Sequence, residues 1–154
     1  MKKLVYGFIG ILSICICFVV TSSISKAQEA TIQDEIIVNE VKLSDYPIVI
    51  NDCTLVPARA VSEKLGFKVI WDKEAQMALI QSEDMEMNIY MGKDLYSAHS
   101  IRAIGMTAPI SLGSAPLLVN GKLYVPAEIF RILQGNSADS LEINEHQVIL
   151  RTIK

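Results

Sequence analysis

Two segments of this chain repeat one pattern at a spacing of 69 residues. Residues 47–57 align without a gap on residues 116–126, and each segment begins and ends with a proline and carries an asparagine at its fifth position. In the same register Gly66 aligns on Gly135. Self-similarity at a fixed spacing is typical of a duplicated supersecondary unit. The sequence therefore predicts two internal repeats, at about residues 36–92 and 105–154.

Each repeated segment has the signals of a β-hairpin. Short β-branched or aliphatic runs lie on both sides of the dipeptide Asn51-Asp52, and of Asn120-Gly121 in the second copy. Asparagine and glycine tolerate the positive φ that a tight primed turn requires, so the second turn has the stronger signal.

A short helix is predicted after each hairpin. Pro57 and Pro126 fit the first helical position, where a missing N–H costs nothing, and Gly66 and Gly135 fit the left-handed residue that ends a helix. Helices of two to three turns do not persist alone in water, so they must pack on a sheet. Ala58, Val61 and Leu65 provide the apolar face of the first helix.

The remaining alternating segments predict strands, with Asp72 in a turn between two of them. The predicted fold class is α+β, a duplicated unit of antiparallel β-strands curled around a short α-helix. Residues 93–107 fit either a hairpin that links the copies or a loop. The strands are expected at residues 67–71, 77–81, 85–90, 141–143 and 147–151.

The N-terminus has the three parts of a secretory signal. Lys2 and Lys3 precede an apolar run over residues 4–20, and Ser25-Lys26-Ala27 places small residues before a cleavage point. We interpret residues 1–27 as a signal peptide and residues 28–154 as the mature domain, which places the protein outside the cytoplasm, secreted or in the cell envelope. The alternative is an uncleaved anchor, and only then would the protein be held in a membrane.

Removal of the leader changes the charge and the cysteine content. It removes three lysines and no acidic residue, so the formal net charge falls from −3 to −6. An acidic chain of this kind is not expected to bind nucleic acid. Of three cysteines only Cys53 remains, so no internal disulfide can form. Cys53 either fills an ordinary strand position or joins two chains in a dimer.

The motif Val-Pro-x-Arg-x-x-x-Glu-x-Leu-Gly at residues 56–66, followed by Val-Ile-Trp-Asp at 69–72, resembles the copper amine oxidase N-terminal-like domain, also called the stalk domain. The resemblance runs from about residue 36 to the C-terminus. It implies a sheet wrapped around a helix in a secreted, non-catalytic module of spore-forming Gram-positive bacteria. The second copy departs from the motif, with Glu128 at the position of Arg59 and Ser140 at that of Trp71.

Residues for catalysis or metal binding are sparse. His99, His146 and Cys53 are isolated in the sequence, so neither a metal site nor a nucleophile with its base is predicted, and no cofactor is expected. We interpret the acidic residues near position 84 as a solvated strand turn that discourages edge pairing, and less readily as a site that attracts a cation or a basic partner. They are Glu83, Asp84 and Glu86.

Aromatic residues are the remaining candidates for a binding surface. Trp71 and Tyr124 would suit stacking on sugars, with Tyr90 and Tyr96 as further candidates, although the apolar strand before Trp71 favours a place in the core or at its rim. Arg59 is interpreted as a structural donor near the turn or as a surface partner of Glu63. The other motif residues are expected to shape the backbone: Pro57, Gly66, Asp72, Pro126 and Gly135.

These observations predict a non-catalytic secreted or envelope-associated module that binds an envelope protein or a cell-wall polymer. The alternative is a carbohydrate- or peptidoglycan-binding module. A small metal-dependent enzyme is the least supported reading of the sequence, because no cluster of ligand residues is present.

Overall fold

The computed structural model describes residues 31–32 and 35–153. The predicted leader, residues 1–27, and its cleavage point lie outside the described residues. Within that part of the chain no helix is both long and apolar enough to cross a membrane.

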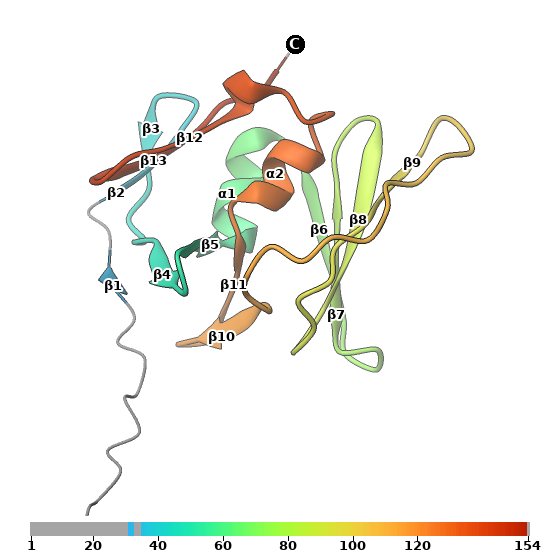
Figure 1. Cartoon of the computed structure of the whole chain (residues 1–154), viewed down its shortest axis with the longest axis horizontal. Helices are drawn as coiled ribbons and strands as arrows, with labels where there is room; N and C mark the ends of the chain where they lie inside the picture. The colour runs from blue at the N-terminus through green and yellow to red at the C-terminus, as the bar shows by residue number, and fades with distance from the viewer. Residues whose placement is uncertain (1–30, 33–34, 154) are drawn as a thin grey trace, which may run out of the picture.

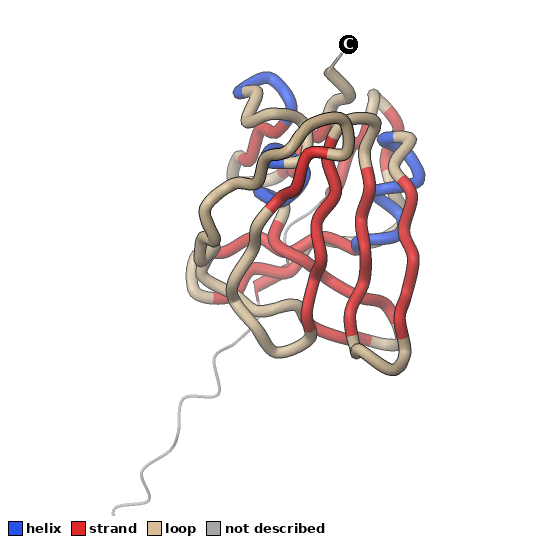
Figure 2. The backbone as a smooth tube through the Cα atoms, turned by 90° about the vertical axis from the view of Figure 1, so that its right-hand side faces the viewer, coloured by secondary structure: helices blue, strands red, loops and turns tan. Residues whose placement is uncertain are grey.

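Three small sheets and two short helices make up the fold (Figures 1 and 2), which agrees with the predicted α+β class. Sheet A has the order β1 (Thr31–Ile32), β4 (Ile48–Ile50), β5 (Cys53–Pro57), β11 (Lys122–Pro126), β10 (Leu117–Val119). Sheet B has the order β12 (Leu141–Ile143), β13 (Gln147–Leu150), β2 (Glu35–Val38), β3 (Val41–Lys42). Sheet C is the meander β6 (Lys68–Asp72), β7 (Met77–Gln81), β8 (Met85–Tyr90), β9 (Ala98–Ser100). The helices are α1 (Ala58–Leu65), α2 (Glu128–Ile132) and the 3-10 helix η1 (Ala138–Ser140).

Both predicted hairpins form. β4 pairs with β5, and β10 pairs with β11, each in antiparallel register. The turn residues have the positive φ values that their types permit, 50° at Asn51 and 61° at Asp52, and 50° at Asn120 and 76° at Gly121. These angles explain why the turn dipeptides were a reliable signal in the sequence.

Both helices begin later than predicted, and α1 ends at Leu65, directly before Gly66 as predicted, whereas α2 ends at Ile132, three residues before Gly135. Pro57 is the last residue of β5, and α1 begins at Ala58; in the second copy Ala127 separates Pro126 from α2. The prolines therefore close a strand, where the chain turns into the helix, and the predicted first helical position was wrong by one or two residues.

The same pair of backbone hydrogen bonds ends both helices. Gly66 N–H donates to the Glu63 carbonyl and Phe67 N–H to that of Ser62; Gly135 and Asn136 repeat these bonds to Ile132 and Arg131. Gly66 has φ 80° and Gly135 has φ 70°, the left-handed conformation expected of a glycine that ends a helix.

The two halves share one core. The N-terminal strand β2 pairs in parallel with the C-terminal strand β13, so the chain ends complete one sheet. This parallel pair departs from the predicted antiparallel arrangement. One continuous cluster of buried side chains includes Ile36 from sheet B, Val61 from α1, Ile80 from sheet C and Phe130 from α2. The halves therefore pack as a single unit.

Residues 93–107, for which the sequence fitted either a hairpin or a loop, fold back on themselves. β9 is followed by a return segment that makes an isolated bridge from His99 to Met106. Tyr96 is buried, and its hydroxyl donates to the Ser114 carbonyl at 2.7 Å. Asp94 fastens the start of this segment to residues 111–113, which follow it, because its carboxylate accepts hydrogen bonds from Ser111 Oγ and from the N–H groups of Leu112 and Gly113.

Candidate binding groove

A hollow of about 540 Å³ opens between α1, the inner face of sheet C and the β10–β11 hairpin. We call it the Trp71 groove. Arg59 and Trp71, both singled out from the sequence, line it together with Pro57. Its lining consists of Asp45, Pro57, Ala58, Arg59, Ala60, Glu63, Val69, Trp71, Ala78, Leu118, Gly121, Lys122 and Leu123.

Trp71 lies one residue from the end of β6, the edge strand of sheet C. Alternation along the strand places it on the same face as Val69, which packs against the core. Its cross-strand neighbour is Ala78, a side chain too small to cover an indole. Trp71 is consequently 42% exposed. Of the two predicted places, the core or its rim, Trp71 thus takes the rim, because its neighbour Ala78 belongs to the core while the indole itself is open to the groove.

Arg59 is an exposed residue in the first turn of α1, and it faces the same groove. Among the described residues its guanidinium makes no hydrogen bond and no ion pair. The predicted partners, Glu63 and the nearby loop carbonyls, are thus not engaged. Glu63 lines the groove one helical turn further on. The groove therefore presents an unpaired cation and, beside it, an exposed carboxylate.

The opposite rim is formed by the β10–β11 hairpin and by Asp45. The Lys122 ammonium is paired with the Asp45 carboxylate, and the hydrogen bond to Asp45 raises the pKa of Lys122. Leu118, which is 65% exposed, adds an apolar side chain. Sequence reasoning missed Asp45, Leu118 and Lys122, because their place opposite α1 depends on pairing between distant segments and has no local signal.

These groups suit reversible binding. An exposed indole offers a flat apolar face, the Arg59 guanidinium offers fixed donors, and Glu63 offers an acceptor. Such a set can hold a ligand that combines an apolar face with hydroxyl, amide or carboxylate groups. Among the residues that the structure describes, no three of the types His, Cys, Asp and Glu converge as metal ligands.

The other candidate aromatic residues lie elsewhere. Tyr124 is only 7% exposed, and burial is the main cause of its raised pKa. The prediction that it shares a binding surface with Trp71 was therefore wrong. Tyr96 is buried as well. Tyr90 is 38% exposed, but it follows the inward-facing Ile89 and so points to the outer face of sheet C, where the Lys93 ammonium lies 4.9 Å from its ring centroid.

Asp72 has the structural role that was predicted. Its Oδ1 accepts the backbone N–H groups of Glu74 at 2.9 Å and Ala75 at 3.0 Å. These bonds fix the turn from β6 into β7 and so hold the strand that carries Trp71.

Cys53 is buried at the start of β5, and its thiol is free. Burial raises its pKa to about 11, with smaller contributions from Asp94 and Glu128. The thiol is therefore protonated at neutral pH and shielded from a second chain, which favours the strand-filling interpretation over a disulfide-linked dimer.

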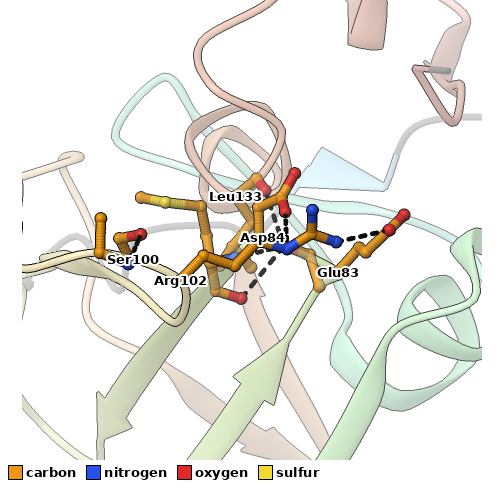
Figure 3. Close-up of polar contacts among 8 residues, drawn as sticks. Glu83, Asp84, Ser100, Arg102 and Leu133 are labelled. Atoms are coloured by element: carbon orange, nitrogen blue, oxygen red, sulfur yellow. Dashed lines mark hydrogen bonds and ion pairs between the residues drawn. The ribbon is translucent and has the colours of Figure 1, made fainter.

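The acidic residues after β7 form ion pairs. Arg102 contacts Glu83 at 2.6 Å and Asp84 at 2.7 Å, and these groups are drawn in Figure 3. The carboxylates thus have a cation from their own chain, which agrees better with a braced turn than with a site for a metal ion.

Comparison with known proteins assigns the chain to a family. The family model described as the copper amine oxidase N-terminal domain matches residues 35–139. A protein of Brevibacillus choshinensis named "Protease inhibitor" is 35% identical over 82 residues, which cover 53% of this chain and 23% of that relative. The match thus spans about a quarter of the relative's length. No solved structure matches the chain. The chain belongs to the copper amine oxidase N-terminal domain family.

Proposed function

We propose that this protein is an exported, non-catalytic binding module of the cell envelope, and that its ligand occupies the Trp71 groove. The observation that carries the proposal is that one hollow is lined both by the exposed indole of Trp71 and by the guanidinium of Arg59, which has no partner in the described part of the chain. Together these two side chains offer a ligand a flat apolar face and fixed hydrogen-bond donors in the same place.

The family supports a binding role over an enzymatic one. The matched domain is named for the N-terminal part of copper amine oxidases. The family resemblance assigns the oxidase chemistry to a separate, larger domain. The relative from Brevibacillus carries the name of an inhibitor, which is a binding activity. The proposal includes residues 1–27 as a cleaved signal peptide and two repeats at about 36–92 and 105–154.

A carbohydrate of the cell wall is the ligand that the groove chemistry favours within this proposal. The apolar face of a sugar ring stacks on indole, and its hydroxyl and carboxylate groups find donors at Arg59 and an acceptor at Glu63. Peptidoglycan and other wall polysaccharides are therefore the first ligands to test, with an envelope protein as the other class of partner.

The test is retention of the secreted protein on purified cell walls. The chain is expressed with its own leader, collected from the medium, and its N-terminus is sequenced to locate the cleavage. Saturable retention that weakens at least tenfold in Trp71→Ala, while folding is unchanged, would support the proposal. Tyr90→Ala, an exposed aromatic on the outer face of sheet C, is the matched control and should bind normally. Equal retention of both variants would contradict it.

A further inference from the structure

A second surface lies at the end of the segment that follows β9. Residues 101–106, which we call the 101–106 tip, project from the body of the molecule (Figure 1). The tip carries three large apolar side chains, and none of them is buried. Ile104 is fully exposed, Met106 is 64% exposed and Ile101 is 42% exposed. Such a cluster on a projecting loop is typical of an interaction site.

Two hydrogen bonds from Ser100 and Ala103 bind the tip to its own base. Ser100 N–H donates to the Gly105 carbonyl at 2.9 Å, and Ala103 N–H donates to Ser100 Oγ at 3.1 Å. These bonds close the loop across its base. A loop that is ordered before it binds loses less conformational entropy on binding.

The tip is also fastened to the β7–β8 turn. Ile101 N–H donates to the Asp84 carbonyl at 2.8 Å, and the Arg102 guanidinium contacts the Glu83 and Asp84 carboxylates. The β7–β8 turn is itself held at the end of α2, because Ser82 Oγ donates to the carbonyl of Leu133, the residue that follows this helix, at 3.0 Å (Figure 3). A projecting apolar tip is therefore braced against a helix of the core.

Acidic groups surround the base of the tip. Glu83, Asp84 and Glu86 supply three carboxylates against the single guanidinium of Arg102, and the whole chain has a formal net charge of −3. This sign of charge is repelled by anionic lipid headgroups, which attract basic loops. It matches a protein surface that carries lysine or arginine around an apolar pocket.

We propose that the 101–106 tip is a docking element for a partner protein, and that Ile104 enters an apolar pocket with a basic rim. Ile101 and Met106 would cover the edge of that pocket, and the acidic residues at the base would face the rim. This surface is separate from the Trp71 groove, so the proposal does not depend on the ligand of the groove.

The test is site-specific photocrosslinking in the cells that make the protein. The full chain carries p-benzoylphenylalanine in place of Ile104, and a control chain carries it in place of Ile70, an isoleucine that is 42% exposed on sheet C. The expected result is a discrete adduct with one protein from position 104 only. Mass spectrometry should place the crosslink in an apolar pocket beside lysine or arginine residues.

The crosslinked protein is then purified and its affinity for the full chain is measured. Ile104→Ser should weaken binding about tenfold or more, since it removes one buried aliphatic side chain, while Ile70→Ser should bind normally. No adduct from position 104, adducts only with lipid or with copies of this chain, or the same adducts from position 70 would overturn the proposal, as would normal affinity in Ile104→Ser.

Discussion

Val56 and Val125 lie directly opposite each other in the β5–β11 pair, and Val125 follows Val56 by 69 residues, the spacing of the sequence repeat. The two flanking pairs are Leu55 with Pro126 and Pro57 with Tyr124. The spacing of 69 residues also relates these two pairs, because Tyr124 corresponds to Leu55 and Pro126 corresponds to Pro57. The paired valines therefore lie on a local two-fold axis that relates β5 to β11. This register supports the proposal of an internal duplication.

One shared core predicts that the two halves unfold together. Leu150 in β13, in the second half of the chain, is completely buried, so Leu150→Ala should lower the free energy of unfolding by about 2–5 kcal/mol. The chain has one tryptophan, Trp71 in sheet C, which reports on a different sheet from the mutation. Urea unfolding followed by circular dichroism and by Trp71 fluorescence should show the same shift in midpoint. A fluorescence midpoint that stays in place would show that the halves are independent.

Gly66 and Gly135, which follow the two helices, should stabilise the fold only through the positive φ that glycine permits. A Cβ at Gly66 or Gly135 would meet no atom within 4 Å, but both residues have a positive φ. Gly66→Ala and Gly135→Ala should each lower the free energy of unfolding by about 1 kcal/mol. Gly105→Ala is the matched control, because Gly105 has equal space without a positive φ. Thermal unfolding that ranks all three variants alike would contradict this account.

The hydrogen bonds to the Asp94 carboxylate predict that the protein loses stability in acid. Although partial burial raises its pKa, hydrogen bonds from Ser111 and from the N–H groups of Leu112 and Gly113 outweigh that effect and lower the pKa. Its contribution is therefore present above the unfolded pKa near 3.8 and is lost as the pH falls through the lower folded value. Asp94→Asn should cost about 1–2 kcal/mol at pH 7.

The same variant should lose less stability than the parent protein as the pH falls below 4. Urea unfolding at pH 7 and at pH 3 measures both effects. An equal loss of stability on acidification in the two proteins would show that protonation of Asp94 does not cause that loss.

The buried thiol of Cys53 predicts that the protein loses stability in alkali. Its folded pKa is raised from 9.0 to about 11, so its contribution to stability is present below pH 9 and is lost as the pH rises towards 11. At pH 7 about one thiol in ten thousand is ionised, and the native protein should react slowly with a thiol reagent and rapidly once unfolded. Cys53→Ala should lose less stability between pH 8 and pH 10.5. Rapid labelling of the native protein at pH 7 would contradict the buried position.

The sequence predicted the local geometry well. The turns at residues 51–52 and 120–121 and the glycines at 66 and 135 are set by residue types that tolerate positive φ, so their positions could be found without a structure. The family resemblance was also confirmed by the matched model.

The groove could not be predicted in the same way. The exposure of Trp71 depends on where the core ends, and its apolar strand favoured burial, while the burial of Tyr124 follows from its central place in sheet A. Asp45 and Lys122 meet although they are far apart in the chain. Contacts of this kind are fixed by sheet order and have no periodic signal.

The central claim is that a wall-derived ligand occupies the groove beside Trp71. Because Trp71 is the one tryptophan, its fluorescence reports on that groove directly. Titration of the secreted protein with solubilised peptidoglycan fragments should give a saturable change in emission, and Arg59→Ala should shift the midpoint to higher concentration. Retention on cell walls with no change in Trp71 emission at saturation would place binding elsewhere and contradict the account.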